Sequence, residues 1–225
     1  MEKKLGVLVG AAPLGGERVS LKKLIAQENT YTVAVDGGIA FFLDHMCSPD
    51  YWLGDMDSFK ENDVLMKYID SKSSEAFLAG IPSSVVSPVK DDTDMDLAVH
   101  HALENGCDEI LIYGGTGGNR ISHTFANIQL LMRFAQKGIR ITLVSERHRM
   151  FVLYNESMKF PETDQGFISI FSLSDISEGV KIKGLLYEYE GSLANDKALG
   201  VSNQFCGKEA MIAVQNGALL IVHEE

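Results

Sequence analysis

The period of hydrophobic and polar positions along the chain changes near residue 147. Before that point, short runs of apolar and β-branched residues alternate with stretches in which apolar residues recur every three or four positions. This alternation is typical of strands joined by amphipathic helices, and it predicts a mostly parallel sheet with helices on both faces. The expected strands are LGVLVG, TVAVD, YWLGD, SSVVSPV, EILIYGG and IRITLVSE.

Two helices are expected within this first part. Apolar residues at spacings of three and four cover residues 95–103, and Gly106 follows as a stop signal. A second apolar stripe covers residues 125–135, after the glycine-rich segment GGTGGN, and Gly138 closes it.

After residue 147 the pattern becomes that of short strands separated by turn residues, as in FVLYNESMKF, FISIFSLS and VKIKGLLYEYE. Asn216 and Gly217 lie between two apolar runs and predict a type I′ hairpin, because both residue types tolerate positive φ. We therefore expect two domains: an α/β domain over residues 1–147 and an all-β sandwich over residues 148–225.

Composition narrows the classes of partner. The chain of 225 residues carries 31 acidic and 20 basic side chains, a net charge of -11, which disfavours nucleic acid and anionic membranes as partners. An anionic substrate would need a bridging cation. The odd number of cysteines, three, without a CxxC pair, favours a reducing compartment, and no apolar run reaches the roughly 20 residues that span a bilayer. A soluble, cytoplasmic protein is expected.

Polar clusters come directly after four of the expected strands. They are Asp36-Gly37-Gly38, residues 54–58 (GDMDS), residues 90–94 (KDDTD) and residues 114–120 (GGTGGNR). In a parallel sheet the carboxyl ends of the strands share one edge, where ligands bind. Ordinary turns explain any one cluster, but four acidic or glycine-rich clusters at one edge favour a binding site.

The two acidic clusters predict a magnesium site. Asp55, Asp57, Asp91 and Asp94 offer hard carboxylate oxygens, which suit Mg²⁺, and Lys90 would contact a phosphate.

The acidic clusters have other interpretations. Thr93 or Asp94 would alternatively serve as a helix cap, and a solvated turn explains GDMDS equally simply. An EF-hand is excluded because Leu97 stands where the loop needs glycine. A dehalogenase-type nucleophile is disfavoured because Gly54 precedes the first aspartate and Phe59 stands where Thr or Val is required.

The segment GGTGGNR lies between an expected strand and an expected helix, where backbone N–H groups and the helix N-terminus favour phosphate oxygens. It is neither a Walker A motif nor GxGxxG, so it indicates neither a P-loop NTPase nor a Rossmann dehydrogenase. Arg120 can hold phosphate in a bidentate fork, although a surface salt bridge is an equally common use. His123, on a neighbouring helical face, is a candidate phosphate or substrate contact.

Taken together, VAVDGG, PDYWLGDMDS, KDDTDMDLA and GGTGGNRISHTFANI, with GLLY and GVSNQ after them, resemble the ordered motifs of thiamine pyrophosphokinases. The resemblance spans nearly the whole chain. It implies an N-terminal α/β domain, a C-terminal β-sandwich and a homodimer with active sites between subunits. The substrates it implies are ATP and thiamine, with Mg²⁺.

The resemblance also implies roles for individual residues. The acidic positions that would hold Mg²⁺ are Asp55, Asp57, Asp91 and Asp94. By the resemblance, Gly115, Asn119 and Arg120 correspond to the loop that binds the ATP phosphates. The further candidates at the ATP, taken from the strand-end clusters and the helix after them, are Asp36, Gly37, Lys90, Thr116 and His123. Those expected at thiamine are Tyr187, Ser202 and Asn203. Without the family, Ser202 and Asn203 would be read as a plain turn and Tyr187 as an aromatic residue of the sandwich core.

One position departs from the family pattern. The family commonly has Asp before the histidine of the helix motif, whereas this chain has Ser122 before His123. The chain would then use Ser122 through water, depend on another aspartate, or accept a different alcohol. Two alternative functions are a pyrophosphokinase for another hydroxymethyl heterocycle such as a pterin, and a non-catalytic protein that binds nucleotide or thiamine.

Overall fold

The chain forms two compact units. Unit 1 comprises Met1–Asn127 and Val144–Glu146, and unit 2 comprises Ile128–Leu143 and Arg147–Glu225. The computed structural model describes residues 4–54, 80–85 and 92–224. The expected domains, residues 1–147 and 148–225, stay a prediction.

Unit 1 contains a parallel sheet in the strand order β5-β1-β2-β3-β4. Its strands are β1 (Lys4–Val9), β2 (Thr30–Val35), β3 (Tyr51–Gly54), β4 (Ser83–Val85) and β5 (Cys107–Tyr113). Val9, the last residue of β1, pairs with Ala34 near the end of β2 and with Tyr113 at the end of β5. The carboxyl ends of these strands therefore meet at one edge, as the alternating pattern predicts.

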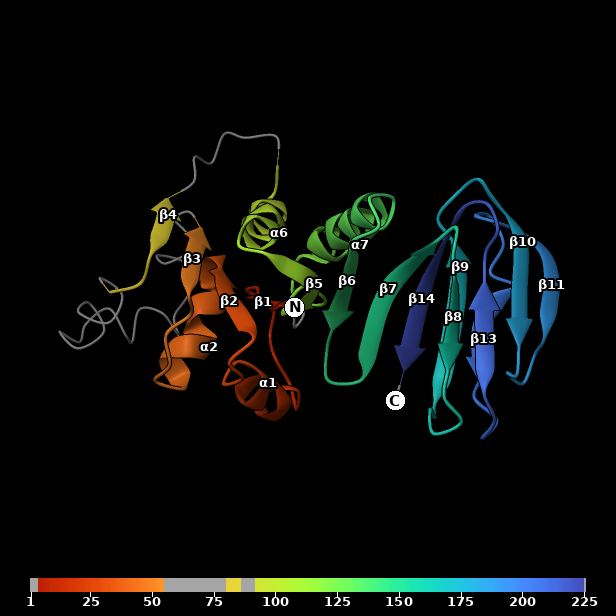
Figure 1. Cartoon of the computed structure of the whole chain (residues 1–225), viewed down its shortest axis with the longest axis horizontal. Helices are drawn as coiled ribbons and strands as arrows, with labels where there is room; N and C mark the ends of the chain where they lie inside the picture. Colours follow the sequence, from red (N-terminus) through yellow and green to blue (C-terminus); the bar gives the residue numbers. More distant parts are fainter. Residues whose placement is uncertain (1–3, 55–79, 86–91, 225) are drawn as a thin grey trace. The chain divides into compact units, whose positions relative to one another are not determined.

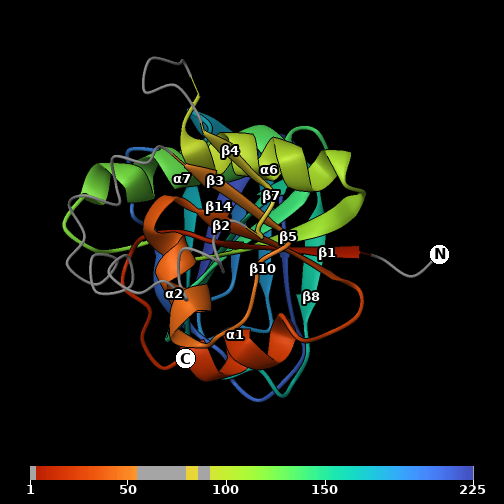
Figure 2. The ribbon, with the colours of Figure 1, turned by 90° about the vertical axis from the view of Figure 1, so that its left-hand side faces the viewer.

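Helices cover both faces of this sheet. The helix α6 (Asp94–Glu104) lies on one face, and α1 (Arg18–Leu24) and α2 (Ile39–Asp44) lie on the other (Figures 1 and 2). Both expected helices are present, as α6 and as α7 (Ile121–Ala135). Thr93 caps α6, since its side chain accepts a hydrogen bond from the backbone N–H of Asp96 at 3.2 Å. The cap is thus a threonine, and the carboxylate of Asp94 is not needed for it.

The core of unit 1 joins the sheet to the helices. A cluster of buried side chains comes from β1, β2, β3, β5, α1 and α2, with Phe42, Ile39 and Leu21 fully buried. A short 3-10 helix, η1 (Asp36–Gly38), connects β2 to α2. A Cβ atom added to Gly38 would lie 1.8 Å from the carbonyl oxygen of Val9, so the backbone passes β1 too closely for any side chain.

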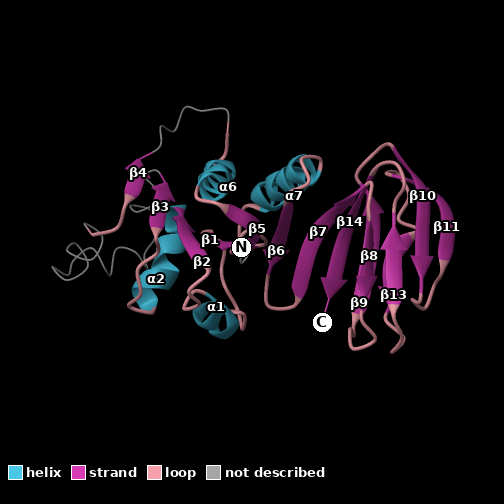
Figure 3. Cartoon of the chain, viewed as in Figure 1, coloured by secondary structure: helices cyan, strands magenta, loops and turns pink. Residues whose placement is uncertain are grey.

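Unit 2 holds two antiparallel sheets. One has the order β12-β9-β14-β7 with β6 after β7, and the other has the order β11-β10-β13-β8. Figure 3 shows that residues 148–224 contain strands and no helix. The strands are β6 (Arg140–Val144), β7 (His148–Tyr154), β8 (Ser157–Phe160), β9 (Phe167–Ser172), β10 (Ile176–Lys183), β11 (Tyr189–Ala194), β12 (Gly200–Gln204), β13 (Ala210–Ala213) and β14 (Ala218–Glu224).

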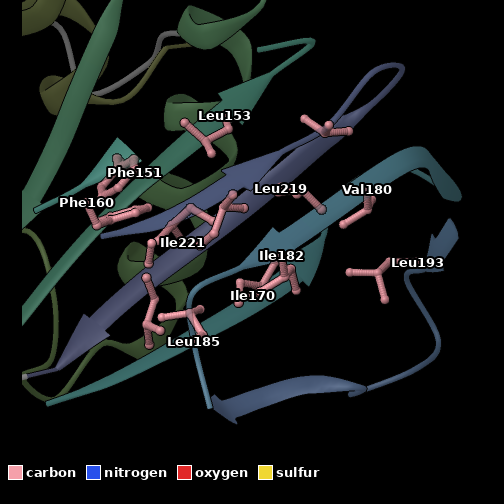
Figure 4. Close-up of a cluster of buried hydrophobic side chains, with 14 of the residues drawn as sticks. Phe151, Leu153, Phe160, Ile170, Val180, Ile182, Leu185, Leu193, Leu219 and Ile221 are labelled. Atoms are coloured by element: carbon pink, nitrogen blue, oxygen red, sulfur yellow. The ribbon is translucent and has the colours of Figure 1, made fainter. Parts of the chain in front are cut away.

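The two sheets enclose an apolar core, as expected for a β-sandwich. Figure 4 shows side chains from β7, β9 and β14 packed against side chains of β10 and β11. Leu153, Leu219 and Ile221 come from one sheet, and Val180 and Ile182 come from the other. Each of these side chains is at most 2% exposed, so they hold the two layers together through burial of apolar surface.

The predicted hairpin at residues 216–217 is wrong. The strand β13 pairs with β8 and β10, whereas β14 pairs with β7 and β9, so the turn carries the chain from one sheet to the other. Of the two turn residues, Gly217 has a positive φ, at 118°, and Asn216 does not. Hydrogen bonds to Glu178 and Asn155 hold the turn, and tertiary contacts therefore decide which strands pair on either side of it.

Candidate functional site

A cavity of about 680 Å³ lies at the carboxyl end of the unit 1 sheet. All of its walls come from residues of unit 1: the segments after β1, β2 and β5, the start of α6 and the first two turns of α7. The lining residues are Gly10, Ala11, Ala12, Pro13, Val35, Asp36, Thr93, Asp94, Met95, Gly114, Gly115, Gly117, Gly118, Asn119, Arg120, His123, Ala126 and Asn127.

The cavity brings together six residues singled out in the sequence. These are Asp36, Asp94, Gly115, Asn119, Arg120 and His123. The wall does not include Gly37, Thr116 or Ser122, although each is close in sequence to a lining residue. Asp55, Asp57, Lys90 and Asp91 lie outside the described residues.

The glycine-rich loop presents its outer backbone to the cavity. The N–H of Gly117 donates to Thr124 Oγ1 at 3.1 Å, so this group is already used within the protein. In the part of the chain that the structure describes, the N–H groups of Gly118, Asn119 and Arg120 have no protein acceptor. These residues are exposed and line the cavity. Consecutive N–H groups before a helix form a site for anions.

The loop after β1 closes one side of the glycine-rich loop. Gly10 N–H donates to the carbonyl of Tyr113 at 2.7 Å, and Ala12 N–H donates to the carbonyl of Gly114 at 3.0 Å. An added Cβ atom on Gly10 would lie 2.6 Å from Gly114 O, and one on Gly114 would lie 2.5 Å from Gly10 O. At Gly10 and Gly114 the two loops touch backbone to backbone, which requires glycine at both positions.

Arg120 and His123 give the cavity its positive side. Arg120 makes no ion pair with any residue that the structure describes, so its guanidinium is available to a ligand. Partial desolvation of its otherwise exposed side chain lowers the pKa of His123, the charge of Arg120 lowers it further, and Asp94 opposes the shift. His123 is therefore neutral near pH 7 and can donate through one ring nitrogen and accept through the other.

The carboxylates of Asp36 and Asp94 form the acidic side. Asp36 follows the end of β2 with a positive φ of 49°, and its carbonyl accepts from the indole Nε1 of Trp52 at 3.3 Å. Asp94 lies in the first turn of α6. Within the described residues no group of three or more Asp, Glu, His or Cys side chains is arranged to hold a metal. Two carboxylates beside an anion site still fit Mg²⁺, which commonly takes one or two carboxylates together with substrate phosphates.

The candidate thiamine residues lie together in unit 2. Asn203 on β12 is 3% exposed, its Oδ1 accepts from the N–H of Tyr187 at 2.9 Å, and its Nδ2 donates to the carbonyl of Tyr187 at 2.7 Å. The side chain of Tyr187 is in contrast 66% exposed. Ser202 has a φ of 57° at a bulge in β12, and its N–H donates to Ser169 Oγ at 3.0 Å.

Two parts of the cavity wall were not predicted from the sequence. Residues 10–13 come after the first expected strand, as the four polar clusters come after theirs, but the segment GAAP lacks charge. Its position after a strand was the available signal. Asn127 continues the helical face of His123, which was its signal in the sequence, but the sequence does not show that its side chain is buried.

Two further observations concern the cysteines and the helices. Cys47, Cys107 and Cys206 are all free cysteines. Among the described residues, no helix combines the length and the apolar character needed to cross a bilayer.

Comparison with known proteins identifies the relatives of the chain. Residues 22–143, more than half of the chain, match the family model described as thiamin pyrophosphokinase, catalytic domain. The thiamine pyrophosphokinase of Bacillus subtilis (strain 168) is 29% identical over 198 residues, which are 87% of each protein.

Solved structures share the fold. The crystal structure of thiamine pyrophosphokinase from Bacillus subtilis superposes with a TM-score of 0.83 at 24% identity, over 98% of this chain and 99% of that one. Yeast thiamin pyrophosphokinase superposes with a TM-score of 0.74 at 14% identity, over 100% of this chain and 87% of that one. At these identities the likeness shows a common fold, which is the α/β unit and β-sandwich expected from the sequence.

Proposed function

The chain belongs to the thiamin pyrophosphokinase family, and from this membership we propose that the unit 1 cavity binds ATP for transfer of its pyrophosphoryl group. The activity is that of an ATP-dependent diphosphotransferase, which moves pyrophosphate from ATP to the hydroxyl of thiamine and releases AMP. One observation carries the assignment of the cavity. Gly118, Asn119 and Arg120, whose N–H groups have no protein acceptor among the described residues, line it together with Asp36 and Asp94.

The glycine-rich loop would bind the phosphates. Its N–H groups and the guanidinium of Arg120 supply donors to several non-bridging oxygens without a change in protonation. Phosphoryl-type transfer requires mainly in-line positioning and stabilisation of charge, so these groups suffice without a covalent intermediate. The thiamine hydroxyl would attack the β-phosphorus, and AMP would leave with the bridging oxygen.

Magnesium is the metal that the donor set fits. Asp36 and Asp94 would hold it in the cavity, with the expected ligands Asp55, Asp57 and Asp91 in the segments outside the described residues. When bound, Mg²⁺ neutralises charge on the triphosphate. The two carboxylates by themselves would repel ATP, which makes binding of nucleotide without a divalent cation unfavourable.

His123 and Ser122 bear on the hydroxyl that reacts. His123, neutral near pH 7, can accept a hydrogen bond from the thiamine hydroxyl or donate one to a phosphate oxygen. Ser122 is exposed at the start of α7, where the family commonly has Asp. We propose that a water on Ser122 takes the place of that carboxylate. The family match favours thiamine over a pterin as the acceptor and an enzyme over a binding protein.

The thiamine side of the reaction is proposed to involve unit 2 and a second copy of the chain. Exposed Tyr187 offers an aromatic face to the cationic thiazolium ring, beside Ser202 and Asn203. The proposed assembly is a homodimer with active sites between the subunits. A cytoplasmic location is also proposed, because the three cysteines are free thiols.

The test is product analysis of the purified chain with ATP, thiamine and Mg²⁺. We expect thiamine diphosphate and AMP in equal amounts, and loss of both products with EDTA. Formation of ADP with thiamine monophosphate would overturn the reaction type. Turnover of a hydroxymethyl pterin but not of thiamine would overturn the acceptor, and binding of both substrates without AMP would indicate a non-catalytic protein.

A further inference from the structure

Asn127 is a buried polar side chain behind the glycine-rich loop. It lies on α7, is 6% exposed, and donates through Nδ2 to the carbonyl oxygen of Gly115 at 2.7 Å. Gly115 is itself buried. A buried carbonyl without a donor is costly, so this bond favours one position of the loop over others.

The rest of the loop is held from two other directions. Thr124, one helical turn before Asn127, accepts from the N–H of Gly117, and Ala12 donates to the carbonyl of Gly114. The close approach of Gly10 and Gly114 prevents the loop from moving toward β1. Of these side-chain contacts, the Asn127 bond is the one that is fully buried.

We propose that Asn127 is a positioning residue for the nucleotide. Through Gly115 it fixes the conformation of residues 114–118, and that conformation directs the N–H groups of Gly118, Asn119 and Arg120 into the cavity. The inference rests on the proposed function, because it takes the ligand of these groups to be the polyphosphate of ATP. A loop that is ordered before binding loses less conformational entropy when it binds, so Asn127 raises nucleotide affinity.

The choice of asparagine suggests the test. Asn127→Asp keeps the size of the side chain but places a carboxylate oxygen against the carbonyl of Gly115. A carboxylate cannot donate a hydrogen bond, whereas a protonated carboxyl can. Burial raises the pKa of such an aspartate above its usual value, whereas the charge of Arg120, which lines the same cavity, opposes the shift. We therefore measure binding across the pH range in which a buried carboxyl titrates.

The experiment measures the dissociation constant of a nonhydrolysable ATP analogue with Mg²⁺ between about pH 6 and pH 8, the range in which a buried carboxyl titrates. We compare the unmodified chain, Asn127→Asp and Asn127→Ala. At the upper end of this range both variants should bind on the order of tenfold more weakly, as the loss of a buried hydrogen bond implies. As the pH falls, Asn127→Asp should recover affinity relative to the unmodified chain, and Asn127→Ala should not. A role in stability alone would not produce this difference.

Two further variants separate positioning from loss of stability. Ile110→Val removes one buried carbon from the unit 1 core away from the cavity wall, so it should lower the melting temperature and leave nucleotide affinity unchanged. Thr124→Val removes the second side-chain contact with the loop and should weaken binding less than Asn127→Ala. If neither Asn127 variant folds, Thr124→Val still tests whether side chains of α7 position the loop: weaker binding of the analogue would support this, and unchanged binding would overturn it.

The outcomes distinguish this inference from the proposed function. If the unmodified chain makes thiamine diphosphate and binds the analogue, but the variants bind equally well at the upper end of the pH range, the positioning role is overturned. The same holds if Asn127→Asp and Asn127→Ala show one and the same pH curve. If the unmodified chain binds no analogue and makes no product, the proposed function itself fails.

Discussion

The glycine-rich loop of unit 1 and the β12 region of unit 2 present candidate ligand groups in two different ways. In unit 1 the exposed groups are backbone N–H groups of a loop that Asn127, Thr124 and the backbone of Ala12 hold in place. In unit 2 the exposed group is the side chain of Tyr187, whose backbone is held at both its N–H and its carbonyl by Asn203. Both asparagines are almost fully buried, at 6% and 3% exposure.

The difference fits the ligand that we propose for each region. An anion is recognised by several N–H groups converging on one point, so the loop conformation itself is the binding element. An aromatic ring recognises a cationic heterocycle by its face, so only the direction of one side chain must be set. In both regions a buried amide supplies the hydrogen bonds that a loop lacks, because a loop has no ladder or helix of its own to satisfy its backbone.

The largest effect should come from removing the positive charge of Arg120 in the unit 1 region. Arg120→Ala removes a guanidinium that makes no ion pair within the described residues, and kcat/KM should fall by about 10² or more. Arg120→Lys should restore part of the loss, since it keeps the charge but not the bidentate fork. Steady-state kinetics with both substrates test this. A loss smaller than about threefold in Arg120→Ala would remove Arg120 from the phosphate site.

The second largest effect should be on stability, where substitutions at positions of positive φ should act differently in the two regions. Gly114→Ala would place a Cβ atom 2.5 Å from Gly10 O at a φ of 61°, and should lower the free energy of unfolding by about 2 kcal/mol or more. Ser202→Gly relieves a positive φ of 57° and should change that free energy by less than about 1 kcal/mol, in the stabilising direction. Urea denaturation measures both. Equal destabilisation by the two changes would contradict the assigned geometry.

A double-mutant cycle tests whether Asn203 acts through Tyr187. Tyr187→Ala and Asn203→Ala should each raise the KM for thiamine by about tenfold, and the double variant should be no worse than the more affected single variant. The KM for ATP serves as the internal comparison and should stay constant. If the double variant instead raises the KM for thiamine by the product of the two single effects, Asn203 contacts thiamine directly, as the family resemblance implies.

The smallest effect concerns His123. Burial and Arg120 both lower its pKa, so Arg120→Gln should raise that pKa while leaving it below the usual value of about 6.5, because burial remains. The unfolded chain takes up a proton at His123 at a higher pH than the folded chain does. This residue therefore lowers stability as the pH falls through about 6.5, and less so in Arg120→Gln. NMR titration of the imidazole, assigned with His123→Gln, measures the pKa. A fall in that value would contradict the proximity of the two side chains.

Much of the fold could be predicted because its signals are local. The spacings over residues 95–103 and 125–135 predict helices with one apolar side, and both helices form where expected, although Phe125 at the start of the second stripe is 65% exposed. The four clusters could be assigned to one sheet edge because parallel strands all end at the same side. Of these clusters, Asp36, Asp94 and most of the segment 114–120 line one cavity in the part that the structure describes.

The failures arise where a local pattern has more than one tertiary outcome. Asn216 and Gly217 form a turn as expected, yet the turn joins two sheets instead of two paired strands, since partner choice depends on β7, β8, β9 and β10. Residues 10–13 carry no charge and became part of the site only because β1 lies next to β5.

The sequence by itself determined the class of fold and the family, and it predicted the edge of the sheet at which the polar clusters meet. The hydrophobic period and the order of the motifs can be read from the chain without knowledge of its contacts. The tertiary structure alone decided which N–H groups of the glycine-rich loop remain for a ligand and that Asn127 and Asn203 face inward. The reason is physical: a hydrogen bond between residues far apart in sequence exists only after packing has buried its donor and acceptor together.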